Sequence, residues 1–83
     1  MDYIKQLEAF YSSLSFNPIS SNAIAIYQYI LHIQWKAGWV QEVSIANITL
    51  QGACSLSLKQ IQGARNELIN ANFINYKKGR KPK

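Results

Sequence analysis

One stretch of the chain carries unusually clear signals for the start of a helix, and these signals constrain the fold more than any other feature. Ser57 and Gln60 stand at capping-box spacing, in which each side chain bonds the backbone N–H of the other residue. Leu56 before the cap and Ile61 after it occupy the positions of a hydrophobic staple. Both signals predict the same helix start and fix the angle at which the chain enters the helix.

The same stretch also indicates where this helix ends and which side of it is buried. Asn72 suits the left-handed position just past a helix end, so we predict a helix over residues 57–71. Arg65 lies near the apolar boundary, where we expect it half buried and paired. The side predicted to be buried holds Ile61, Ala64 and Leu68. The opposite, largely polar side holds Lys59, Gln62, Gly63, Asn66 and Asn70.

Two longer helices are predicted earlier in the chain. Residues 2–15 place apolar side chains at the i, i+3, i+4, i+7 spacing of an amphipathic helix, which Pro18 ends. Ser20 is a good N-cap for a second helix over residues 21–37. This second helix is apolar around most of its circumference, so we expect it to be central in the domain or partly covered by a second subunit.

A short helix and two short strands complete the predicted elements. Residues 46–54 read as a helix with Ile48 and Leu50 facing inward. The apolar runs at 39–45 and 73–76 allow strands. The order of a short helix, a tight turn, the capped helix, a strand and a basic turn predicts a winged helix-turn-helix, mostly α with a small β wing.

Charge is concentrated in the closing third of the sequence. Residues 1–58 carry two lysines against three carboxylates, which gives 2 − 3 = −1. Residues 59–83 carry seven Lys or Arg against one Glu, which gives 7 − 1 = +6. This polarity favours a polyanionic partner such as nucleic acid. We assign residues 1–76 to a DNA-binding or oligomerisation domain and residues 77–83 to a basic wing turn or tail.

Other function classes find little support in the sequence. The carboxylates are scattered, and Cys54 and His32 are the sole residues of their types, so neither an active site nor a metal or cofactor site is predicted. We expect Cys54 to be a buried, inert thiol and His32 to be a hydrogen-bonded core residue. The sequence shows no signal peptide and no apolar stretch of membrane-spanning length, so we expect a cytoplasmic protein that does not bind membranes.

Three segments resemble the N-terminal winged-helix domain of DnaD-like proteins, which are replication-initiation proteins or phage replisome organisers of Gram-positive bacteria and their phages. They are "YIKQLEAFY", "NPIS–AIAIYQYILHIQWKAGW" and "LSLKQIQGARNELINANFINYKKG". The resemblance implies a primosome component that binds DNA or self-associates. It also implies a C-terminal domain for single-stranded DNA and helicase loading, to which no part of this chain corresponds, so we expect the chain to be a fragment or a reduced version.

The predicted function is therefore DNA binding in replication initiation, at an origin-like duplex site, by a homodimer or larger oligomer. A helicase loader or another initiation protein is a further expected partner. Lys59, Gln62 and Asn66 are predicted to contact base edges or the groove, and Gly63 to permit close approach of the helix. Ser57, at the start of this helix, is also assigned to the DNA-binding site. The predicted contacts to the DNA backbone are Lys77, Lys78, Arg80 and Lys81.

Two alternatives stay open at this stage. The domain could be an oligomerisation or partner-docking module, with DNA bound elsewhere in a longer protein. Gly63 favours this reading, because DnaD-like proteins often have a basic residue there. The chain could instead be a small phage-type transcriptional repressor, which would share the same site chemistry and differ in the operator that it binds.

Overall fold

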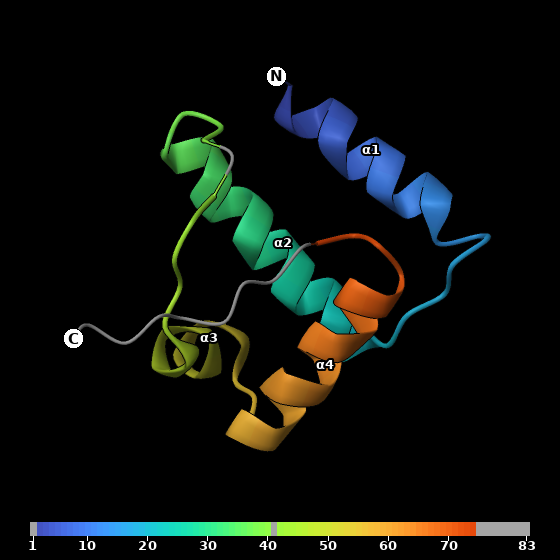
Figure 1. Ribbon diagram of the computed structural model, residues 1–83. Helices are drawn as coiled ribbons and strands as arrows, with labels where there is room; N and C mark the ends of the chain where they lie inside the picture. The colour runs from blue at the N-terminus through green and yellow to red at the C-terminus, as the bar shows by residue number, and fades with distance from the viewer. Residues whose placement is uncertain (1, 41, 75–83) are drawn as a thin grey trace.

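A computed structural model describes residues 2–40 and 42–74, and within these ranges all regular secondary structure is helical. The four helices are α1 (Tyr3–Ser13), α2 (Ser21–Lys36), α3 (Asn47–Cys54) and α4 (Leu58–Asn70). Each lies within two residues of its predicted range. Figure 1 shows α2 crossing the middle of the molecule, with α1 on one side and α3 and α4 on the other.

The ends of the long helices are fixed by local chemistry. The Asp2 carboxylate accepts the backbone N–H of Ile4 at 2.9 Å and caps α1. The Ser20 hydroxyl accepts the N–H of Ala23 at 3.2 Å and caps α2, as predicted. Gly38 follows α2 with a φ of +80°, a conformation that glycine adopts without steric strain. The chain therefore leaves α2 in a new direction at Gly38.

The hydrophobic core lies where α2, α3 and α4 meet. Six side chains form its centre, and none is more than 3 % exposed: Ala23, Ile26, Leu50, Ile61, Ala64 and Leu68. Burying one Leu or Ile side chain stabilises a fold by about 1.5–3 kcal/mol. Among the four described helices, α2 contacts each of the others, whereas α1 contacts α2 alone. Of the two expectations for this apolar helix, the central position in the domain is the one that the described residues show.

Three aromatic rings attach α1 and the end of the described chain to α2. Phe10 of α1 stacks on Tyr27 of α2, with ring centroids 4.0 Å apart and an interplanar angle of 14°. Phe73 meets Phe10 edge-on at 5.0 Å and lies 5.9 Å from Tyr27. Phe73 is thus packed, and its ring helps to hold α1, which otherwise buries few side chains.

The predicted β wing is contradicted, because residues 2–40 and 42–74 contain no strand. Trp39 has a φ of +62°, which is incompatible with an extended strand start, and residues 42–46 run without a hydrogen-bonded neighbour strand. Phe73 packs into the aromatic cluster, and Ile74 follows without regular structure. Asn75 and Tyr76 lie outside the described residues. The winged helix-turn-helix assignment is therefore wrong, and the described fold is all-α.

One inward-facing residue was also predicted incorrectly. Leu50 is 3 % exposed, as expected, but Ile48 is 73 % exposed. With eight residues, α3 makes little more than two turns, and Leu50 is its one fully buried side chain. Ile48 consequently adds apolar surface to the outside of the molecule.

Candidate nucleic-acid interface

The start of α4 is fixed by the predicted capping box. The Gln60 backbone N–H donates to the Ser57 hydroxyl at 3.2 Å, and the Ser57 N–H donates to the Gln60 side-chain oxygen at 2.9 Å. Ser55 closes α3 in a left-handed conformation with φ +56°, and Leu56 packs against the core. Three residues thus join α3 to α4. This turn holds α4 in a defined direction against the core.

The buried side of α4 matches the sequence prediction. Ile61 and Leu68 are fully buried, and Ala64 is 2 % exposed. Because a helix repeats every 3.6 residues, burial of these positions turns the opposite side of α4 outward. We call that side the outward face of α4. It consists of Lys59, Gln62, Gly63, Asn66 and Asn70, all of which are exposed.

The outward face therefore brings together the predicted site residues of this helix. Lys59, Gln62, Gly63 and Asn66 share one side, and Ser57 is exposed at its start. A Cβ atom added to Gly63 would find no heavy atom within 4 Å, so the surface there is open. The described part of the protein does not cover this face.

Two polar contacts tie the flanks of α4 to other helices. The Arg65 guanidinium donates a hydrogen bond to the side-chain oxygen of Asn47, at the start of α3. On the other flank, Glu67 accepts the Ser20 backbone N–H at 2.8 Å and the Ser20 hydroxyl at 2.7 Å. The prediction that Arg65 is half buried and paired is confirmed. The contact of Glu67 with the start of α2 could not be predicted from local sequence signals, because its partner lies 47 residues away.

These contacts determine the charge of the outward face. Of the three charged residues in α4, Arg65 and Glu67 are directed to the flanks, and Lys59 remains on the outward face. The face thus carries one positive charge, several amides and no carboxylate. The predicted backbone contacts lie outside the described residues: Lys77, Lys78, Arg80 and Lys81.

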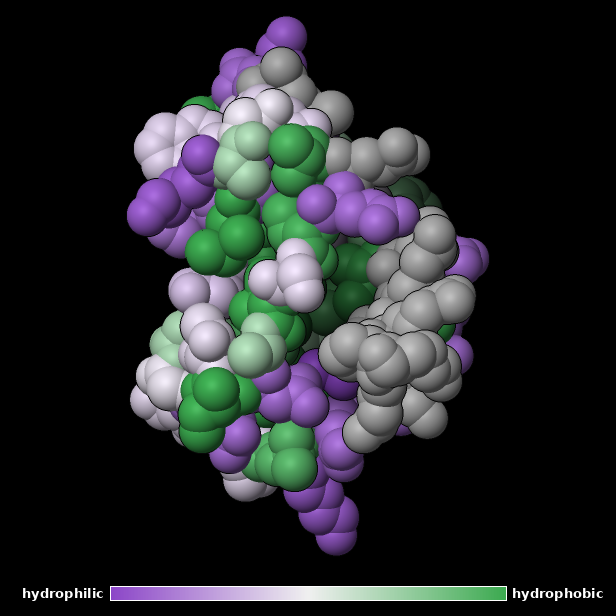
Figure 2. Space-filling model, turned by 60° about the vertical axis from the view of Figure 1, so that its left-hand side comes forward, coloured by the Kyte–Doolittle hydropathy of each residue, from purple (hydrophilic) through white to green (hydrophobic). Residues whose placement is uncertain are grey.

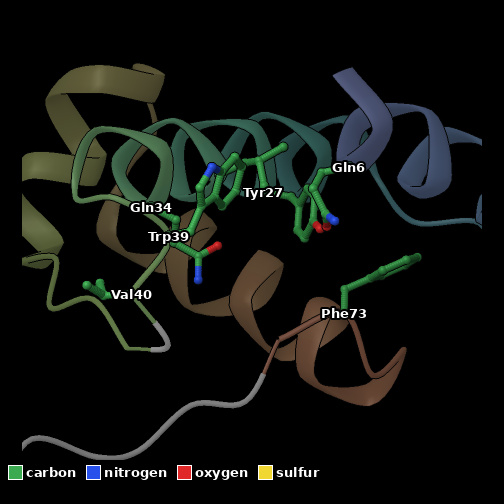
Figure 3. Close-up of a pocket in the computed structure, with 7 residues that line it drawn as sticks. Gln6, Tyr27, Gln34, Trp39, Val40 and Phe73 are labelled. Atoms are coloured by element: carbon green, nitrogen blue, oxygen red, sulfur yellow. The ribbon is translucent and has the colours of Figure 1, made fainter. Parts of the chain in front are cut away.

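A hollow of about 390 Å³ lies between α1, the C-terminal half of α2 and Phe73, and Figure 3 shows the side chains that enter it. Its polar groups are the amides of Gln6 and Gln34, the Trp39 indole and the Tyr27 hydroxyl. Burial raises the pKa of Tyr27, which keeps this hydroxyl protonated near neutral pH. None of the described side chains that line the hollow is a carboxylate, a histidine or a thiol.

His32 and Cys54 line a second hollow, between α2 and α3. His32 packs between the rings of Tyr29 and Trp35, at 6.2 and 6.0 Å, and is partly buried. Cys54 is partly rather than fully buried, and desolvation raises the pKa of its thiol, which disfavours the reactive thiolate. No group of three or more potential metal ligands occurs within residues 2–40 and 42–74.

Comparisons with protein-family models, with curated proteins and with solved structures found no match to this chain. None of the helices in the described ranges is both long enough and apolar enough to cross a membrane.

Proposed function

We propose that this protein binds double-stranded DNA through the outward face of α4. The observation that carries the proposal has two parts. The capping box fixes the start of α4, and the solvent-facing side of this helix has polar groups and no negative charge. An α-helix fits the major groove, and exposed polar side chains on it can reach base edges. From the resemblance to DnaD-like proteins, we propose that this DNA binding serves replication initiation at an origin-like site.

The charge distribution supports a polyanionic partner. Residues 59–83 have a net charge of +6, and their single carboxylate, Glu67, is bonded to Ser20 at the start of α2. Phosphate contacts would come from the four basic residues assigned by the sequence: Lys77, Lys78, Arg80 and Lys81. Such contacts contribute affinity without reading the base sequence.

The test is the salt dependence of duplex binding, measured by fluorescence anisotropy. Each lost phosphate contact should reduce the slope of log K against log salt by about 0.9. Lys77→Ala together with Lys78→Ala should therefore flatten the slope by about two units. Lys5→Ala is the matched control, because Lys5 is an exposed lysine on α1, away from the outward face. Absence of duplex binding even at low salt would reject the proposal.

Exposed apolar surface supports a second candidate function, self-association or partner docking. Ile48 is 73 % exposed and Trp35 is 50 % exposed. Figure 2 shows apolar side chains gathered in a band on the side that lies to the left in Figure 1. A protein that forms dimers in sedimentation equilibrium but has no affinity for duplex DNA would establish this function in place of the first.

A further inference from the structure

We infer that the outward face of α4 reads A·T base pairs from the major groove through a row of side-chain amides. This inference rests on the proposed binding of duplex DNA and adds the class of sequence that the protein selects. The expected ligand of the outward face is duplex DNA that contains A·T base pairs. The basis is the chemistry left on the outward face after Arg65 and Glu67 are turned toward neighbouring helices.

The amides form a single row along the helix. Gln62, Asn66 and Asn70 follow one another at intervals of four residues, and all three are exposed. With a rise of 1.5 Å per residue, neighbouring amides stand about 6 Å apart along the axis, and the whole row extends about 12 Å. The side-chain amides have no hydrogen-bond partner among the described residues, so their donors and acceptors face solvent.

An amide matches adenine better than any other base edge in the major groove. Adenine presents the N7 acceptor beside the N6 donor, and one Asn or Gln side chain can bond both at once, through its NH2 group and its carbonyl oxygen. Guanine presents two adjacent acceptors, which suit the two parallel donors of an arginine. On a guanine, the amide carbonyl oxygen of Gln62 or Asn66 would face a second acceptor.

The structure directs two side chains that could read G·C pairs, Arg65 and Glu67, away from the outward face. Arg65 is the only arginine of α4, and its guanidinium is bonded to Asn47 on the flank of the helix. A carboxylate could accept from the cytosine N4 group, but Glu67 is the only carboxylate in α4 and its two oxygens are bonded to Ser20. The outward face retains Lys59 as its one cation, at the first turn. The positive charge of Lys59 complements the negative charge of DNA, and the side-chain amides distinguish the bases.

Gly63 adds a steric argument. It follows Gln62 on the outward face, and no side chain of the described residues lies within 4 Å of the place where its Cβ would be. Because Gly63 has no side chain, the helix surface beside the row of amides does not project toward the solvent. A low surface lets the bases approach within the hydrogen-bonding distance of about 3 Å that short amide side chains require.

The experiment compares the affinity of the full chain for three duplexes of equal length. One is A·T-rich, one is G·C-rich, and the third is the A·T-rich duplex with 7-deazaadenine, which lacks the N7 acceptor but keeps the minor groove unchanged. We expect the A·T-rich duplex to bind at least about tenfold more tightly than the G·C-rich duplex, since a good bidentate contact discriminates by about that factor. The 7-deazaadenine duplex should lose this advantage.

Three substitutions separate base reading from general affinity. Gln62→Ala and Asn66→Ala should each reduce A·T affinity about tenfold and leave G·C affinity unchanged. Asn17→Ala, at an exposed amide between α1 and α2, should leave the ratio of the two affinities unchanged. Thermal unfolding followed by circular dichroism verifies that each variant is folded.

The outcomes also separate this inference from the proposed function. Equal, salt-dependent binding of A·T and G·C duplexes would overturn the amide readout and leave DNA binding intact. An A·T preference that survives 7-deazaadenine would also overturn it, since the protein would then read the minor groove or DNA shape. A protein without affinity for any duplex would refute both.

Discussion

Gly63→Ala is expected to stabilise the protein while weakening its binding to DNA. Gly63 lies in the interior of α4, where glycine is less favourable than alanine by about 0.8–1.0 kcal/mol. The added methyl group meets no atom within 4 Å, so no steric penalty offsets this gain. The free energy of unfolding should therefore rise by about 1 kcal/mol, and the melting temperature of a chain of this size by about 4–8 °C.

The same methyl group stands on the outward face of α4. If DNA approaches closely at Gly63, the extra carbon forces the helix away from the groove, and we expect a penalty of about 1 kcal/mol, or roughly fivefold in duplex affinity. Chemical denaturation and fluorescence anisotropy on one preparation measure the two effects together. Stability and binding should change in opposite directions.

Gly52→Ala is the matched control. Gly52 is a helical, exposed glycine of α3 with no heavy atom near the added Cβ, and it lies outside the outward face. Its replacement should raise stability in the same sense and leave DNA affinity unchanged. A Gly63→Ala variant that is less stable would refute the structural reasoning. One that is more stable and binds DNA equally well would refute the role of close approach.

Two further predictions concern stability. Glu67→Ala should lower the free energy of unfolding by about 1–2 kcal/mol, because Ser20 at the start of α2 loses two hydrogen bonds that it donates to a charged acceptor. An unchanged urea midpoint would contradict this. Burial raises the pKa of both Cys54 and Tyr27, so the folded protein holds these protons more tightly than the unfolded chain. Their contribution is complete at lower pH and is lost as the pH rises above about 8.5, where the unfolded thiol begins to ionise. Urea midpoints should therefore fall as the pH rises from about 8.5, and a constant midpoint would argue against the burial of these groups.

Local signals predicted the helices well because their causes lie within a few residues. The capping box joins Ser57 to Gln60, three positions away, and Gly38 ends α2 through its own backbone conformation. The buried side of α4 follows from helical periodicity alone. For the same reason the outward face, with Gln62 and Asn66, could be predicted before the structure.

The strand predictions failed because a strand depends on a partner. The run at 39–45 is apolar enough for a strand, but nothing within it says whether another strand lies beside it. Phe73 shows the same problem in another form. Its apolar side chain does pack, but against Phe10 and Tyr27, and this packing does not require a strand.

The sequence by itself determined where the helices begin and end, which side of α4 is buried, and that positive charge gathers after Lys59. The tertiary structure decided what the charged residues of α4 do. Arg65 bonds Asn47, 18 residues away, and Glu67 bonds Ser20, 47 residues away. Such partners come together only when helices pack, because packing sets the direction of each flank of α4. That packing leaves the amides and a single lysine on the outward face.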